Sequence, residues 1–190
     1  MQQPQQSIRT GAIQEISPLE LVTKVRDFFQ VKELTLPGTW VLEIIHGNAA
    51  FGRGCARTLH PTGDRGVNIC LFQRSIPLSQ RCTINMQNML STPVHELTDG
   101  EISSIEEALG SMALKEEFDI AVIRTMDLNN RRVLFLTGAW LRSDMRVMSV
   151  ITCDPRKPHL LQEIYYAAIG ERFMQHLSSA SQILRSICWA

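Results

Sequence analysis

The stretch FDIAVIRTMDLNNRRVLFLTGAWLRSDMRVMSVITC, residues 118–153, contains three apolar segments separated by short polar breaks. The segments cover residues 118–126, 132–141 and 146–153 and are rich in β-branched and aromatic residues, which favour strands. Each segment is too short to be a typical helix, and each is bounded by turn-forming residues. This stretch therefore predicts three strands in succession.

The two polar breaks determine how these strands pair. Asn129-Asn130 lies between the first two segments, and Ser143-Asp144 lies between the second and third. Asn and Asp tolerate left-handed backbone and favour tight hairpin turns. Strands joined by such short connections must run antiparallel. The three strands are therefore predicted to form an antiparallel sheet.

These predicted strands are apolar on both faces. Val122 alternates with Ile123, and Phe135 alternates with Leu136. Because successive side chains in a strand point to opposite faces, a sheet of this kind needs a layer packed over each face.

Further strands are predicted on either side of this centre, each bounded by a turn or a Gly-rich loop. They cover residues 39–45, 54–59, 67–72 and 161–168, and for the last of these a helix start is the alternative. The Pro61-Thr62-Gly63-Asp64 turn is short enough to make the second and third of these strands antiparallel.

Helices are predicted from apolar residues at helical spacing. Ser17, Pro18 and Glu20 form a helix start, and Val25 and Phe28 belong to the apolar stripe that follows. Further helices are predicted at residues 78–90, from 98 or 99 to about 110, and at 170–187. The last has the clearest stripe: Phe173, Leu177, Ala180, Leu184 and Ile187.

These elements predict an α+β fold, an α/β/α sandwich with a six- to seven-stranded, mainly antiparallel sheet. The chain of 190 residues fits one domain. We expect a polar N-terminal tail at residues 1–16 and a single domain at residues 17–190.

Composition narrows the classes of function. Lys plus Arg equals Asp plus Glu, 19 each, which argues against a general nucleic-acid binder. The charge is uneven: residues 50–90 carry five arginines against one acid, and residues 91–130 carry nine acids against two bases. These segments are either solvated faces or, for the acidic one, a helix face that docks a basic partner.

The cysteines and the apolar segments bear on the compartment. Five scattered cysteines with no CxxC favour a reducing compartment and hence the cytoplasm. No segment has the roughly 20 apolar residues of a membrane span. Residues 1–6 lack the basic and apolar regions of a signal peptide, and an exported or tethered protein whose signal has been removed is the alternative.

The C-terminal half resembles a known superfamily. Residues 162–166 read QEIYY and lead into a long helix, and the chain closes with Ser186, Ile187, Cys188 and Trp189. This pattern, with the Trp-containing early strand at 39–45, resembles the PsbP-like superfamily. That superfamily includes the extrinsic photosystem II protein, a Ran-binding import factor, DcrB-type bacterial proteins and the Eag secretion chaperones. The resemblance implies an α/β/α sandwich and a protein-binding role, and it assigns these residues to the core.

Three segments contain residue types that occur in active or metal sites. The Gly-rich run at 46–54 lacks the Lys and Ser/Thr of a P-loop and reads as a strand connection. Residues 95–101, from His95 to Glu101, read as helix capping rather than a metal site. Cys153 and His159 lack any sign of an oxyanion hole. The sequence therefore predicts no catalytic residue, metal site or cofactor.

The function favoured by the sequence is a non-enzymatic adaptor, assembly factor or chaperone that binds another protein. Met side chains adapt to varied partners, so a Met-rich patch on the helix at 78–90 is a candidate docking surface, with core filling as the alternative. The candidate partner-binding residues are Arg81, Ile84, Met86, Met89, Leu90 and Glu96, together with Arg53 and Arg57.

Two other functions stay open. A small-molecule-binding or hydrolytic protein would use the Arg53/Arg57 loop with His46 or His60. A homodimer would pair one edge of the sheet across a two-fold axis.

Overall fold

The structure is a computed structural model, and it describes residues 23–45, 56–75, 86–103, 105, 118–141 and 143–190. Two antiparallel sheets and two named helices make up this part of the chain. The predicted tail at residues 1–16 lies outside the described residues.

The larger sheet has seven strands in the order β3-β4-β5-β9-β8-β7-β6, all antiparallel. Its strands are β3 (Trp40–Ile45), β4 (Ala56–Pro61), β5 (Val67–Ser75), β6 (Phe118–Leu128), β7 (Arg131–Trp140), β8 (Met145–Asp154) and β9 (Lys157–Ile169). The long C-terminal strand β9 therefore lies in the middle, between β5 and β8. The predicted α+β fold class and strand number are confirmed.

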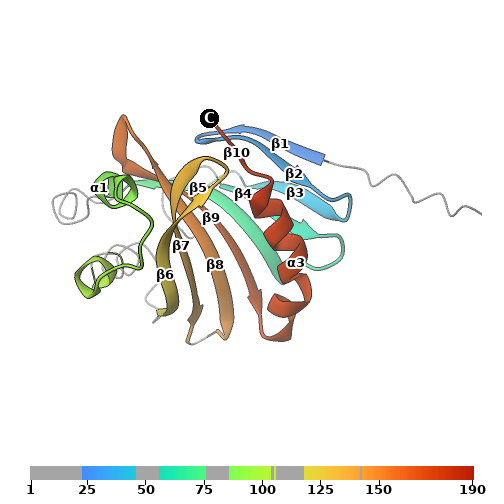
Figure 1. The fold of residues 1–190 in the computed structure, drawn as a ribbon. Coiled ribbons are helices and arrows are strands. Elements are labelled where there is room, and N and C mark those ends of the chain that lie inside the picture. The colour runs from blue at the N-terminus through green and yellow to red at the C-terminus, as the bar shows by residue number, and fades with distance from the viewer. Residues whose placement is uncertain (1–22, 46–55, 76–85, 104, 106–117, 142) are drawn as a thin grey trace, which may run out of the picture.

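The smaller sheet joins the two ends of the described chain. It contains β1 (Thr23–Phe28), β2 (Val31–Leu36) and the short β10 (Cys188–Trp189), in the order β1-β2-β10. Helix α3 (Glu171–Arg185) lies beside this sheet across one face of the large sheet. Helix α1 (Met86–Ser91) and a helical turn at residues 99–103 lie at the opposite end of the molecule (Figure 1).

The hairpin turns follow the local sequence. Asn129 and Asn130 have φ values of 50° and 64°, and Asp144 has a φ of 49°. Asn and Asp accept this left-handed backbone more readily than other non-glycine residues. Both predicted turns, and the turn at Gly63 with a φ of 83°, are confirmed.

The predicted N-terminal helix is wrong for residues 23–28, which form β1. Val25 and Phe28 are both buried although they are three residues apart. Asp27, between them, has a φ of 50°, which interrupts the strict alternation of a strand. A spacing of three matches the helical period, so the sequence pattern was misleading at this point.

The first core lies between the large sheet, α3 and the small sheet. Leu34 and Leu36 of β2 and Ile164 and Tyr166 of β9 have no exposed surface. Trp189 of β10 packs against this core and donates its indole N–H to the Leu128 carbonyl at 2.8 Å. The QEIYY strand and the terminal Trp thus hold the structural positions that the resemblance implied.

The second core lies on the opposite face of the large sheet, beneath α1. Met86 and Met89 of α1 pack with Leu97 and Ile105 against side chains of β6 to β9. The strand prediction for residues 161–168 is confirmed over the helix alternative, and the strand begins earlier than predicted, at Lys157.

Tyr166 makes the core sensitive to high pH. Its hydroxyl donates to the Phe173 carbonyl at 2.7 Å, and burial raises its pKa from the usual 10 to about 12. The folded state therefore holds this proton more tightly, so the stabilisation is complete below pH 10 and is lost as the pH rises toward 12. As the pH rises from 9.5 to 11.5, we expect the melting temperature of Tyr166→Phe to fall less than that of the wild type. Parallel losses in the two proteins would refute this assignment.

Candidate protein-binding surface

One face of the large sheet loses its cover from the centre toward the β6 edge. Tyr166, Met148, Thr137 and Val122 form one cross-strand row through β9, β8, β7 and β6. Tyr166 is 0% exposed beneath α3, Met148 is 8% exposed, Thr137 is half-buried and Val122 is 45% exposed. The helix layer therefore does not reach the outer strands.

The neighbouring row shows the same loss of cover. Ile164 and Val150 are buried, Phe135 is half-buried and Arg124 is exposed. The Arg124 guanidinium lies 5.8 Å from the centre of the Phe135 ring. The contact places an exposed guanidinium over the half-buried Phe135 ring.

Helix α3 borders this exposed part of the sheet on one side. Ser179, on one flank of the helix, accepts a hydrogen bond from Trp40 at 3.1 Å, so that flank faces β3. Met174 lies on the opposite flank, which faces β8 and β7, and it is 62% exposed. Leu177 lies next to it and is half-buried. The apolar surface thus continues from the strands onto the helix.

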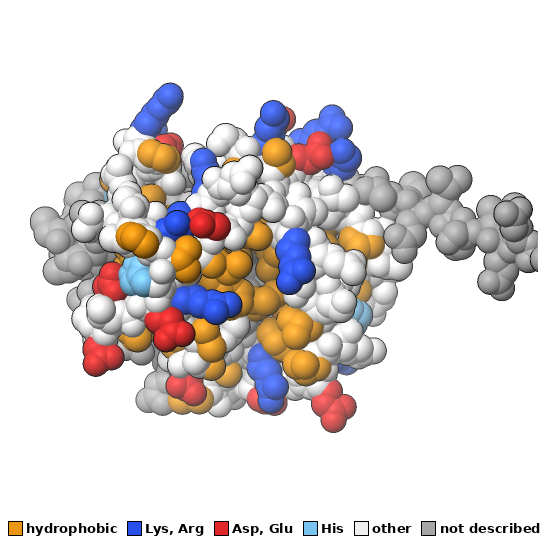
Figure 2. Space-filling view, viewed as in Figure 1, with side chains coloured by type: hydrophobic (Ala, Val, Ile, Leu, Met, Phe, Trp, Pro, Cys, Tyr) orange, Lys and Arg blue, Asp and Glu red, His pale blue; other side chains and the backbone are white. Residues whose placement is uncertain are grey.

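We call this surface the open strand face and define it as Val122, Phe135, Thr137, Met174 and Leu177. Figure 2 shows hydrophobic side chains gathered over the outer strands and the adjacent side of α3. At its upper end, the Asn129 side chain donates to the carbonyls of Arg185 and Ile187 at 2.7 and 2.6 Å. The β6–β7 turn therefore closes one end of the surface.

Three arginines surround the open strand face. Arg124 lies on β6, and Arg146 lies on β8 in the row of Ala168, on the same side of the sheet. Arg185 lies on the same helical flank as Met174. All three are exposed, and none forms an ion pair with another described residue.

The predicted Met-rich docking surface does not present its Met side chains to solvent. Met86 is 1% exposed and Met89 is 6% exposed, both in the second core, and Leu90 is half-buried against it. The core-filling alternative accounts for both Met residues, because the helical spacing placed them on the face of α1 that packs against the sheet.

The remaining predicted partner-binding residues lie apart from one another. Arg53, Arg81 and Ile84 lie outside the described residues. Glu96 is exposed and forms an isolated bridge with Arg124 through the backbone. The Arg57 guanidinium donates to the Arg26 carbonyl at 2.9 Å and lies 4.9 Å from the Phe28 ring centre. A role for Glu96 in partner binding stays a prediction.

The alternative site that combines Arg57 with His60 is not formed. The two residues are three positions apart on β4, so their side chains point to opposite faces. Arg57 contacts β1, whereas His60 lies on the other face, with Nε2 3.7 Å from Glu43. His46 lies outside the described residues.

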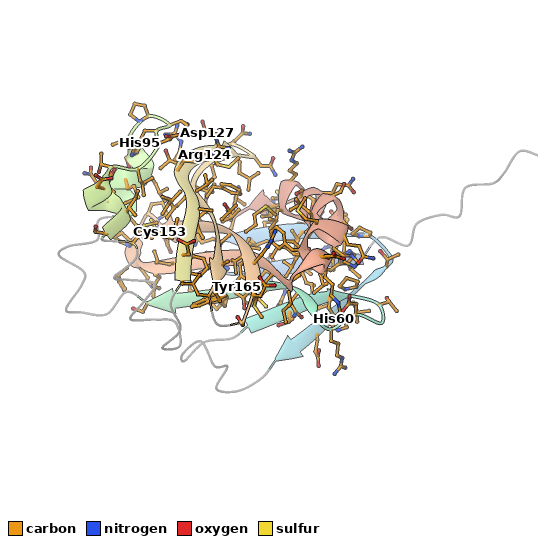
Figure 3. The ribbon with its side chains drawn as sticks, turned by 90° about the horizontal axis from the view of Figure 1, so that it is seen from below. His60, His95, Arg124, Asp127, Cys153 and Tyr165 are labelled. Atoms are coloured by element: carbon orange, nitrogen blue, oxygen red, sulfur yellow. The ribbon has the colours of Figure 1, made fainter. Side chains whose placement is uncertain are left out.

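The His95 segment is a helix cap, as predicted. The Thr98 amide and hydroxyl both donate to Glu101, at 2.9 Å each, and these bonds lower the pKa of Glu101. His95 packs with Thr125 beside Arg124 at the β6 edge (Figure 3). Within the described ranges, no cluster of His, Cys, Asp and Glu has the arrangement of a metal site.

Cys153 is a core residue. It is 6% exposed, and burial raises the pKa of its thiol, which disfavours the thiolate that a nucleophile needs. Cys70, Cys153 and Cys188 are free thiols. The Gly-rich run at 46–54 lies outside the described residues.

The face opposite α3 carries a polar row that the sequence pattern did not reveal. Glu43, Thr58, Cys70, Tyr165 and Ser149 are direct cross-strand neighbours on five adjacent strands. The fully buried Ser149 donates to Glu163 at 2.9 Å, and burial raises the pKa of Cys70. The bond satisfies two buried polar groups, and the raised pKa disfavours the Cys70 thiolate that a nucleophile needs.

The sequence did contain a signal for the open strand face. Val122 and Phe135 belong to strands that are recognisably apolar on both faces. The prediction that each face would be covered is wrong for the outer part of the α3 side, because within the large sheet α3 packs mainly against β9 and β5. A doubly apolar strand without a helix to cover it is the signal that points to this surface.

The layers and strand order define the chain as an α+β sandwich, and comparison with solved structures makes the fold specific. The solution structure of cyanobacterial PsbP (CyanoP) from Synechocystis sp. PCC 6803 superposes with a TM-score of 0.56 at 9% identity, over 95% of this chain and 99% of that one. A protein of unknown function from Pseudomonas aeruginosa gives a TM-score of 0.45 at 10% identity, over 88% and 96% of the chains. The chain has a PsbP-like fold.

Sequence comparison adds no family or activity. No protein-family model matches the chain, and no curated protein is similar to it in sequence. Among the described residues, no helix has the length and apolar character needed to cross a membrane.

Proposed function

We propose that the protein is a non-enzymatic protein-binding module, of the adaptor, assembly-factor or chaperone kind, and that its partner docks on the open strand face. The observation that carries this proposal is the rise in exposure from Tyr166 at 0% to Val122 at 45% along one row of an otherwise packed sheet.

The composition of the open strand face fits a protein interface. Aromatic, Met and Arg side chains are enriched in interfaces, and Phe135, Met174 and Arg124 supply one of each. Burying Val122 and Met174 against a partner would remove apolar surface from water at about 25 cal/mol per Å². The PsbP-like fold supports a binding role only by analogy, because a fold can host many functions.

The proposal predicts that Val122→Asp abolishes partner capture and leaves the fold intact. The variant replaces an apolar contact with a carboxylate that the docked partner would have to desolvate, which costs several kcal/mol. The melting temperature should change little, since Val122 lies half-exposed on the edge strand β6.

Val41 offers a matched control. It is also a valine on an edge strand, 43% exposed on β3 at the opposite end of the sheet. A photo-crosslinking amino acid at position 122 should yield a discrete protein adduct in cells of the source organism, and the same group at position 41 should not. Adducts at both positions, or at neither, would refute the proposed docking surface. The mass of the adduct tells a second copy of the chain from another protein.

A further inference from the structure

We propose that the segment of the partner that docks on the open strand face is an amphipathic α-helix whose polar side carries carboxylates. This inference rests on the proposed function. The room beside α3, the sheet and helix that border it and the charges around it each contribute an independent step to the argument.

The sheet beside α3 has room for one more helix. Strands in a sheet lie about 4.8 Å apart and packed helices about 8–10 Å apart, so a helix beside α3 would be centred about two strands away, over β7. A helix with its side chains is about 10–12 Å in diameter. One helix laid beside α3 would therefore complete the layer that α3 begins over β9 and β5.

The sheet and helix α3 together define the length and the apolar side of this docked helix. Helix α3 has 15 residues, which corresponds to a length of about 22 Å, and the Asn129 contact with Arg185 closes one end. A docked helix would contact Val122 and Phe135 beneath it and Met174 and Leu177 beside it. An apolar stripe of about four turns on the docked helix would contact both the sheet and α3.

The charges around the open strand face select an acidic partner. Arg124, Arg146 and Arg185 lie on three sides of it, and none is paired among the described residues. The three cross-strand rows that contain Arg124, Val122 and Arg146 on this side of the sheet include one described carboxylate from β6 to β8, that of Asp119. Glu96, the backbone bridge partner of Arg124, lies outside these rows and adds a second carboxylate. Three guanidinium groups therefore outnumber two carboxylates, and carboxylates on the solvent side of a docked helix would lie near guanidinium groups.

Four synthetic helical peptides of about 16 residues test the inference by fluorescence polarisation with the full chain. Three share one Leu/Phe stripe and carry Glu, Gln or Lys on the polar side, and the fourth is a scrambled Glu peptide without the stripe. We expect the Glu peptide to bind about tenfold tighter than the Lys peptide, since each exposed ion pair contributes a few-fold. The difference should shrink between 50 and 500 mM NaCl, because salt screens exposed charges.

Charge reversal identifies the residues responsible. The double variant Arg124→Glu/Arg146→Glu should reverse the preference and bind the Lys peptide more tightly. Arg156→Glu, an exposed residue in the β8–β9 turn at the far end of β8, should leave the preference unchanged.

The outcomes separate this inference from the proposed function. Equal binding of the Glu, Gln and Lys peptides, lost in Val122→Asp, would refute the acidic preference and keep the docking surface. Binding of the scrambled peptide as tight as that of its parent would refute the amphipathic helix. Binding of none of the peptides would contradict the inference, and the crosslinking at position 122 would then decide whether the docking surface itself stands.

Discussion

Replacing Met89 by Asp should lower the melting temperature by about 10 °C or more. Met89 is 6% exposed and packs in the second core with Leu97 and Ile105. An unpaired carboxylate there costs several kcal/mol, and in a chain of this size each kcal/mol shifts the melting temperature by about 2–4 °C. Circular dichroism melts at pH 7 measure the effect.

Gln87 supplies the control on the same helix. It is exposed two residues before Met89, so Gln87→Asp adds the same charge to α1 without burying it. Its melting temperature should stay within about 2 °C of wild type. If Met89→Asp melted like Gln87→Asp, the Met89 side chain would be available at the surface, and the Met-rich patch would regain its place as a candidate docking surface.

The strands of the large sheet could be predicted because local and long-range signals agree there. Asn129-Asn130 and Ser143-Asp144 accept left-handed backbone, and the segments between them have the composition of strands. Turn chemistry and apolar pattern therefore specify the same antiparallel pairs. The capping residues Thr98 and Glu101 were likewise predictable, since a capping box is a contact between residues three positions apart.

The N-terminal hairpin could not be predicted from its periodicity. In β1 the left-handed Asp27 allows Val25 and Phe28 to face the same core, and the resulting spacing of three imitates a helix. What determines the strand is its pairing with β2, which in turn pairs with β10 at the far end of the chain. The pairing of β2 with β10 joins Glu33 to Cys188, so no local window of sequence contains it.

The open strand face depends on the position of α3, which sequence alone does not supply. Val122 reads as a core residue because it alternates in an apolar strand. It becomes a surface residue because β9, to which α3 is connected, lies in the centre of the sheet and leaves β6 at the edge. The same argument explains Met86 and Met89, whose helical spacing is equally compatible with a core and with a docking surface.

Gly138 should be the least replaceable glycine of the described sheet. A Cβ at this position would meet the backbone oxygen of Asp119 and would lie 2.6 Å from Cζ and 2.8 Å from Cε1 of Phe118. Phe118 crosses over Gly138 to contact the Trp140 ring, with centroids 4.8 Å apart. Even alanine would therefore force the end of β6 away from β7. We expect Gly138→Ala to lower the melting temperature by about 5–10 °C, since overpacking costs about 1–3 kcal/mol.

Gly100 makes the comparison decisive, because a Cβ there would meet nothing within 4 Å. Gly100 lies in the helical turn at residues 99–103, so Gly100→Ala should leave stability unchanged or raise it by about 0.5–1 kcal/mol. The two variants make the same chemical change and restrict the unfolded chain equally, so opposite signs would isolate the contact with β6. If Gly138→Ala were as stable as wild type, β6 could move away from the added Cβ without lowering the free energy of unfolding. The packing of Phe118 over Gly138 would then not be what fixes the position of that strand.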